Sequence, residues 1–197
     1  LERGFKIGHF ICDQAYLPGC APEDLALPLR ARGINTVFDY PKTWAGLGVQ
    51  GGHAGALLVG GKYVCPSTPK ELLTAAEDFY LRAADDPLRI DRATYEERIE
   101  RLQRYVLKTK ENADAEGFSR LICPAEGKYA TVKCPNKPVA AKDEKPGRTV
   151  IPLKMLVTPT PPICQSGSKT FPASADAKYG QKYLHESKEW QAYYAPL

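Results

Sequence analysis

The sequence lacks a long hydrophobic run. No apolar stretch among its 197 residues approaches the roughly 20 residues that a membrane-spanning helix needs, which excludes a helical membrane protein. The opening Leu1-Glu2-Arg3-Gly4 has neither the basic segment nor the apolar segment of a secretory signal. We therefore expect a cytoplasmic protein with no membrane partner.

Several motifs of nucleotide and hydrolase chemistry are also missing. GxxxxGK[ST], GxGxxG and GxSxG do not occur, so neither a phosphate-binding loop nor an α/β-hydrolase nucleophile is supported. Histidine is scarce, because His9, His53 and His185 stand alone, without HxxxH spacing or a neighbouring nucleophile. We interpret all three as structural or surface residues rather than as catalytic bases.

The composition that remains is that of a globular protein. Hydrophobic residues make up 43% and charged residues 25% of the chain, and at this length a chain can bury a real core. The sequence also contains 16 glycines, 17 prolines and six cysteines. These counts indicate a protein with many turns and loops, of one domain or of one domain and a second small one.

The net charge of +4 is unevenly distributed along the chain. Residues 1–97 carry 10 basic and 13 acidic side chains, whereas residues 98–154 carry 13 basic and 7 acidic ones. A basic stretch of this kind favours a polyanion such as DNA, and a solvated charged face is the alternative interpretation. The predicted phosphate contacts are Arg101, Arg104, Lys108, Lys110, Lys128 and Lys133.

The pattern along the chain predicts an α+β or α/β fold. Apolar residues 5–12 and the β-rich residues 34–40 predict two strands, with a short helix over 29–32 between them that ends at Gly33. Residues 46–61 contain seven glycines and no periodicity, which predicts a linker. Beyond Lys108 the periodic pattern dissolves into a loop-rich region.

Three helices are predicted from their capping residues. Thr68, followed by Pro69 and Glu71, forms a capping-box pattern, and Asp91 precedes a clear helical pattern. The helix after Asp91 also contains the i,i+4 pairs Glu97–Arg101 and Glu100–Arg104 in the favourable order. Ser187 is a suitable cap for a C-terminal helix.

Four cysteines lie in the irregular half of the chain: Cys65, Cys123, Cys134 and Cys164. The first three each precede a proline, and thiolates on such knuckles could form a tetrahedral zinc site that supplies folding energy. No CxxC spacing occurs, so disulfides and plain buried thiols stay open as alternatives. Cys12 and Cys20 are interpreted as ordinary thiols.

Asp13 is the candidate for metal chemistry. It directly follows an apolar strand, where α/β sheets place metal-binding or catalytic groups. Aspartates at strand ends also cap loops, so the position by itself does not decide between the two roles. Asp39 follows a strand as well, but we do not include it in the metal-binding set.

Several segments, in order along the whole chain, resemble the DDE-type insertion-sequence transposases of actinobacteria. The signature around the second acidic residue of that family resembles Ile11-Cys12-Asp13-Gln14-Ala15-Tyr16. Further segments that resemble the family are Gly61 to Pro66, Leu121 to Ala125, Val132 to Pro135, Ile163 to Gln165, Thr170 to Pro172, Ala177 to Gln181 and Ser187 to Tyr194.

This resemblance implies a partial ribonuclease H-like sheet that a cysteine-containing insertion domain interrupts. It implies a core at 1–45, the linker at 46–61, a helical and cysteine-containing insertion at 62–175, and a C-terminal helix at 176–197 that returns to the core. In the family an acidic triad binds two Mg²⁺ or Mn²⁺ ions for DNA strand transfer, and Asp13 would be one ligand.

The acidic set that the family requires is incomplete here. The strand with the first Asp would lie before Leu1, and the sequence ends at Leu197 before a matching Glu. We therefore expect an incomplete transposase-like protein that binds DNA and is catalytically inactive by itself. The alternative is a non-catalytic, zinc-stapled module that binds nucleic acid or protein, and a homodimer is left open.

Overall fold

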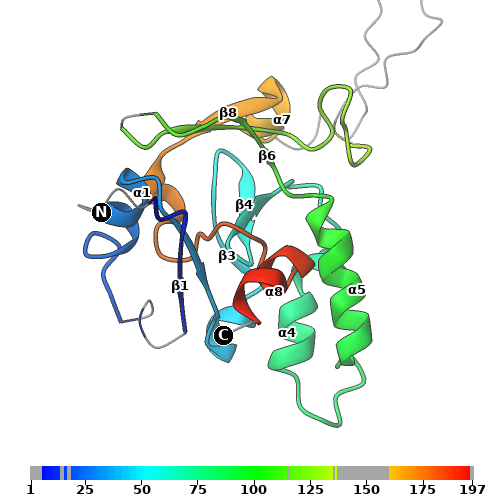
Figure 1. Cartoon of the computed structure of the whole chain (residues 1–197). Coiled ribbons are helices and arrows are strands. Elements are labelled where there is room, and N and C mark those ends of the chain that lie inside the picture. Colours follow the sequence, from blue (N-terminus) through cyan, green and yellow to red (C-terminus); the bar gives the residue numbers. More distant parts are fainter. Residues whose placement is uncertain are drawn as a thin grey trace, which may run out of the picture.

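The computed structural model describes residues 6–13, 16, 19–114, 116–134, 136 and 160–195 (Figure 1). Over these residues the chain is a mixed α+β protein with short helices and three small sheets. The α+β class expected from the sequence is confirmed at this level. No helix within the described residues has the length and apolar character needed to cross a membrane.

The first sheet is a parallel pair of strands. Strands β1 (His9–Cys12) and β2 (Asn35–Phe38) pair along their whole length, so that Cys12 lies opposite Phe38. Helix α1 (Ala26–Ala31) connects them, and Gly33 has a φ of +71°, a conformation that favours glycine. The strand–helix–strand order predicted from the sequence is therefore confirmed.

The second sheet corrects the expectation of a linker at 46–61. After the short helix α2 (Lys42–Ala45), this stretch forms strands β3 (Val49–His53) and β4 (Ala56–Val59), and β5 (Lys62–Val64) adds a third antiparallel strand. The glycines allow the tight turns between these strands. At Gly55, with a φ of +82°, an added Cβ would lie 2.7 Å from the Cβ of Pro161.

The helix expected to begin after Thr68 differs from the prediction. It is broken into α3 (Lys70–Leu73) and α4 (Ala75–Tyr80), and no side chain caps α3. Instead, the Thr68 hydroxyl donates a hydrogen bond to the carbonyl of Cys65 at 2.6 Å. The Thr68 side chain therefore stabilises the turn after β5 and does not cap a helix.

Helix α5 (Arg92–Gln103) begins as predicted, because the Asp91 carboxylate accepts a hydrogen bond from the Thr94 N–H at 2.8 Å. The predicted Glu97–Arg101 ion pair is present at 3.8 Å. Glu100 pairs with Lys188 at 2.9 Å and not with Arg104. The helix packs its apolar face into the first hydrophobic cluster, whose buried members are Val59, Val64, Leu72, Ala75, Tyr95, Ile99, Leu102 and Leu184.

A third sheet forms from Lys108 onwards, where the sequence predicts a loop-rich region. Strands β6 (Lys108–Glu111), β7 (Ser119–Ile122) and β8 (Ser168–Phe171) are antiparallel, and α7 (Pro162–Ser166) precedes β8. The second hydrophobic cluster joins this sheet to the second one through Ala56, Leu58, Tyr63, Leu107, Ile163 and Phe171. Short polar strands such as β6 carry little periodic signal, which explains why the sequence did not indicate them.

The C-terminal segment packs on the first sheet. After the 3₁₀ turn η1 (Ala173–Asp176), the N–H of Lys182 donates to the carbonyl of Thr36 in β2 at 2.9 Å. Helix α8 (Lys188–Tyr194) then lies close to β2. Ser187 caps α8 as predicted, because its hydroxyl accepts the Trp190 N–H at 3.2 Å.

Candidate functional site

Two aspartates emerge side by side from the parallel sheet. Asp13 follows β1 and Asp39 follows β2, directly after the paired residues Cys12 and Phe38. Burial, and then the negative charges of Asp39 and Asp13, raise the pKa of the Tyr194 hydroxyl in α8. Both carboxylates therefore lie close enough to Tyr194 for their charges to act on its hydroxyl.

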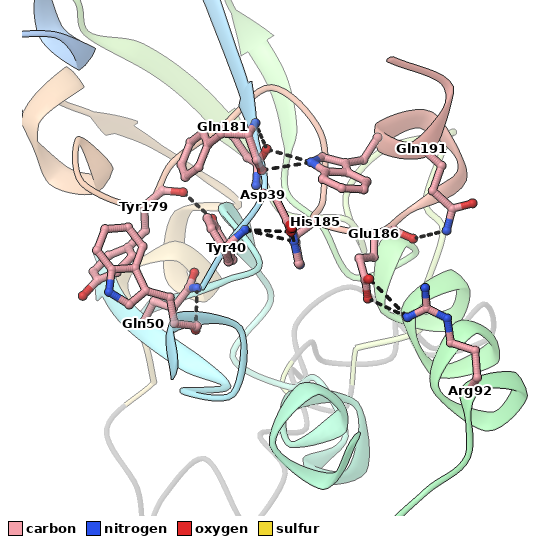
Figure 2. Close-up of polar contacts among 12 residues, drawn as sticks. Asp39, Tyr40, Gln50, Arg92, Tyr179, Gln181, His185, Glu186 and Gln191 are labelled. Atoms are coloured by element: carbon pink, nitrogen blue, oxygen red, sulfur yellow. Dashed lines mark hydrogen bonds and ion pairs between the residues drawn. The ribbon is translucent and has the colours of Figure 1, made fainter. Parts of the chain in front are cut away.

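Asp39 is hydrogen-bonded to a histidine, His185, that lies 146 positions later in the chain. Its Oδ1 is 2.8 Å from Nε2 of His185, and it also accepts the N–H of Tyr40 at 2.8 Å (Figure 2). His185 is only 3% exposed, and its imidazole stacks on the Tyr40 ring with centroids 4.5 Å apart. His185 therefore ties the C-terminal segment to the end of β2, in keeping with a structural role.

A glutamine and a tryptophan complete this network. The Gln181 side-chain oxygen accepts the backbone N–H of Phe38 and the indole N–H of Trp190, each at 3.1 Å (Figure 2). All three groups are buried. Sequence reasoning missed this network, since no local spacing relates residues 38 and 39 to residues 181–190.

The other two histidines do not join this network. His9 stacks against Tyr193 with ring centroids 4.8 Å apart, and it lies 3.4 Å from the hydroxyl of Tyr183. His53 packs against the ring of Phe171 at 5.1 Å. Within the described residues, no group of three or more His, Cys, Asp or Glu side chains is placed to hold a metal ion. Asp13 thus has no ready set of co-ligands in this part of the chain.

Three of the four predicted zinc cysteines lie close together. Cys65 follows β5, and its thiol is hydrogen-bonded to that of Cys123, which follows β7. Ser67 links this pair to Cys134, because its N–H donates to Cys65 Sγ at 3.5 Å and its Oγ lies 3.8 Å from Cys134 Sγ. Hydrogen bonding to Cys123, together with burial, raises the pKa of the Cys65 thiol, which is therefore neutral at physiological pH.

The fourth predicted cysteine has a different setting. Cys164 lies in α7 and packs against the second hydrophobic cluster. None of the six cysteines forms a disulfide in the structure. The structure thus brings Cys65, Cys123 and Cys134 together as thiols.

Four of the six predicted phosphate contacts gather around one loop. The loop of residues 123–134 carries Lys128 and Lys133 itself. Arg104, directly after α5, donates to the Thr131 carbonyl at 3.3 Å, and Lys108 of β6 donates to the Tyr129 carbonyl. In Figure 1 this loop, in yellow-green, lies beyond the C-terminal end of α5.

The remaining two predicted contacts differ from each other. The Arg101 guanidinium is already engaged in ion pairs, with Glu71 at 3.5 Å and with Glu97. Lys110 is exposed on β6. The basic residues near the loop therefore form the stronger candidate surface, and Arg101 is the weakest of the six candidates.

Sequence reasoning missed the aromatic residue at the centre of this surface. Tyr129 is 72% exposed, and the ammonium group of Lys128 lies 4.9 Å from the centre of its ring. The signal that could have revealed it is the Gly-Lys-Tyr sequence at 127–129, a turn glycine followed by a cation and an aromatic ring. Arg104, Lys108, Lys128, Tyr129 and Lys133 are called the loop surface below.

The chain was compared with protein-family models, curated proteins and solved structures. No family model, no curated protein and no solved structure matches this chain.

Proposed function

We propose that this chain is a nucleic-acid-binding module derived from a DDE-type transposase, and that the loop surface contacts the nucleic acid. The observation that carries the proposal is that Arg104 and Lys108, from two other segments, both donate to the loop that carries Lys128, Tyr129 and Lys133. Clustered cations neutralise phosphates and release counterions, and an exposed aromatic ring adds contact with bases.

The transposase origin rests on the resemblance of segments along the whole chain. The parallel pair β1–β2, with Asp13 at its carboxyl end, is compatible with a fragment of the ribonuclease H-like sheet that the resemblance implies. In such a sheet Asp13 would be one ligand of Mg²⁺ or Mn²⁺. Asp39 is bonded to His185 and serves the packing of the C-terminal segment instead.

Zinc binding by the cysteines is a further part of the proposal. Cys65, Cys123 and Cys134 come from three segments around Ser67, and an N–H donated to a cysteine sulfur two residues earlier stabilises a thiolate. Zinc binding requires Cys134 to move towards the other two sulfurs. Because Cys123 and Cys134 bound the loop 123–134, zinc at this position would fix the loop surface, and Cys164 is the predicted fourth ligand.

Elemental analysis of the reduced full chain tests the zinc proposal. We expect about one zinc per chain, which is lost in the double variant Cys65→Ser/Cys123→Ser and retained in Cys20→Ser, whose cysteine is exposed. Reduced wild-type protein that takes up no zinc from solution would contradict it.

Charge reversal tests the proposed DNA contact. The variant Lys128→Glu/Lys133→Glu should bind a duplex oligonucleotide at least about tenfold more weakly than the wild type at low salt, because two phosphate contacts become repulsive. The matched control Lys42→Glu/Lys70→Glu makes the same change of charge at exposed lysines of α2 and α3 and should bind as the wild type does. Equal losses in both variants would show that only net charge matters, and would contradict a specific loop surface.

A further inference from the structure

Tyr129 stands out among the exposed apolar side chains of the described residues. Its 72% exposure is higher than that of Leu88, Tyr16 or Tyr193, which are 62%, 64% and 41% exposed. A large aromatic ring held in water has an unfavourable hydration that a ligand can relieve. An exposed ring among cations is therefore a candidate contact for a flat, uncharged group attached to an anion.

The backbone beneath this ring is held in place by several hydrogen bonds. The Thr131 N–H donates to the Pro124 carbonyl at 2.8 Å, and the Thr131 hydroxyl donates to the Arg104 carbonyl at 2.6 Å. Lys108 donates to the carbonyl of Tyr129 itself. A loop whose backbone is held in this way needs little rearrangement when Tyr129 binds, which favours its use as a contact residue.

The loop that carries the ring has more basic than acidic side chains. Lys128 and Lys133 are exposed, and Glu126 is the only acidic residue in the sequence from 119 to 134. The Glu126 carboxylate lies beside Gly167, where an added Cβ would come within 2.8 Å of its Oε2. The loop therefore presents an aromatic ring with a lysine beside it, while its carboxylate lies next to Gly167, between α7 and β8.

We propose that Tyr129 stacks on an unpaired nucleobase, so that the loop surface binds single-stranded nucleic acid in preference to duplex. This inference rests on the proposed function and assigns its ligand class. In a duplex the faces of the bases are covered by their neighbours, whereas an unpaired base offers its face to an aromatic side chain. The neighbouring cations hold the phosphates on either side of the stacked base.

The experiment compares single-stranded and duplex oligonucleotides of the same sequence on the full chain. Tyr129→Leu should weaken single-strand binding roughly tenfold, as removal of a stacking residue does, and should leave duplex binding nearly unchanged. Tyr129→Trp should restore single-strand binding. Phe118→Leu is the matched control at another exposed aromatic residue and should have no effect on either ligand. Because Tyr129 is exposed, thermal melts of these variants should coincide with that of the wild type.

A 2-aminopurine base within the single strand reports stacking directly, since its fluorescence falls when it stacks on an aromatic ring. We expect quenching by the wild type and by Tyr129→Trp, and much less by Tyr129→Leu at saturation. Unchanged affinity and quenching in Tyr129→Leu, with weaker binding by Lys128→Glu/Lys133→Glu, would overturn the stacking role and leave the proposed function standing. A wild-type chain that binds neither oligonucleotide would overturn both.

Discussion

At the scale of single residues, two buried tyrosines differ in what their hydroxyls contact. The Tyr40 hydroxyl donates a hydrogen bond to the carbonyl of Tyr179, whereas the buried Tyr63 hydroxyl has no hydrogen-bond partner among the described residues. Burial raises the pKa of both phenols. A buried polar group without a partner loses its hydration and gains nothing in exchange.

The contrast predicts opposite effects of the same substitution. Tyr63→Phe should leave the free energy of unfolding unchanged or raise it by up to about 1 kcal/mol, while Tyr40→Phe should lower it by about 1–2 kcal/mol. Urea unfolding of the two variants and the wild type measures both values. A loss in Tyr63→Phe as large as that in Tyr40→Phe would show that the Tyr63 hydroxyl has a partner.

The same residues predict how stability depends on alkaline pH. Since burial raises the folded-state pKa of Tyr63 above the ordinary value of 10.0, the unfolded chain releases this proton first. The contribution of the protonated Tyr63 to the free energy of unfolding is therefore complete below about pH 10. It is lost as the pH rises further, by at most about 1.4 kcal/mol per pH unit for each such tyrosine. Unfolding free energies measured from about pH 9 to about pH 11 should fall less steeply in Tyr63→Phe than in the wild type. Parallel curves would contradict the assignment.

At the scale of secondary-structure elements, local signals were predictable and long-range pairings were not. Asp91 and Ser187 cap helices as expected, because a capping bond spans only three residues. Thr68 fits the same pattern, yet its hydroxyl bonds to Cys65 in the preceding turn. The composition of 46–61 indicates a linker because short strands rich in glycine have little hydrophobic alternation. In the structure β3 is stabilised by pairing with β4, which pairs in turn with β5.

In the candidate site, too, local features were predictable from the sequence and long-range contacts were not. The basic residues of the loop surface could be listed from the sequence, but their convergence depends on contacts between Arg104 and Thr131 and between Lys108 and Tyr129, more than 20 residues apart. The contact between Asp39 and His185 joins the first sheet to the C-terminal segment. Such contacts form only when distant segments pack, so residue spacing carries no record of them.

Replacing Gln181 tests how much the hydrogen bonds between the C-terminal segment and β2 contribute to the free energy of unfolding. In Gln181→Leu the buried N–H of Phe38 loses its side-chain acceptor, while the Trp190 indole N–H keeps only the Phe38 carbonyl at 3.1 Å, and we expect the free energy of unfolding to fall by about 1–3 kcal/mol. Gln191→Leu removes only a bond to the Glu186 carbonyl and should cost less than about 1 kcal/mol. Chemical denaturation measures the difference, and equal losses would contradict the role of Gln181.

At the scale of the whole molecule, the loop surface and the aspartates lie in different places. The loop lies beyond the C-terminal end of α5, whereas Asp13 and Asp39 follow the strands of the first sheet (Figure 1). Binding and any metal chemistry should therefore respond to different substitutions. Two-metal strand transfer needs several carboxylates around both ions, and Asp39 is already bonded to His185.

These positions predict a chain that binds without cutting. With Mg²⁺ or Mn²⁺ the 197 residues should neither nick nor join DNA, and Asp13→Ala should bind DNA within about twofold of the wild type, because Asp13 lies outside the loop surface. Supercoiled plasmid and a labelled oligonucleotide provide the assays. Metal-dependent cleavage that Asp13→Ala abolishes would show that further carboxylates complete a catalytic centre.

The salt dependence of binding tests the loop surface most directly. The logarithm of the association constant for a duplex should fall linearly with the logarithm of the salt concentration, with a slope of about −0.9 for each phosphate neutralised. Replacing Lys128 and Lys133 by alanine should make this slope less negative by about 2, whereas Lys42→Ala/Lys70→Ala should leave it unchanged. Identical slopes in the wild type and in Lys128→Ala/Lys133→Ala, or wild-type binding that does not change with salt, would contradict a phosphate-binding surface on this loop.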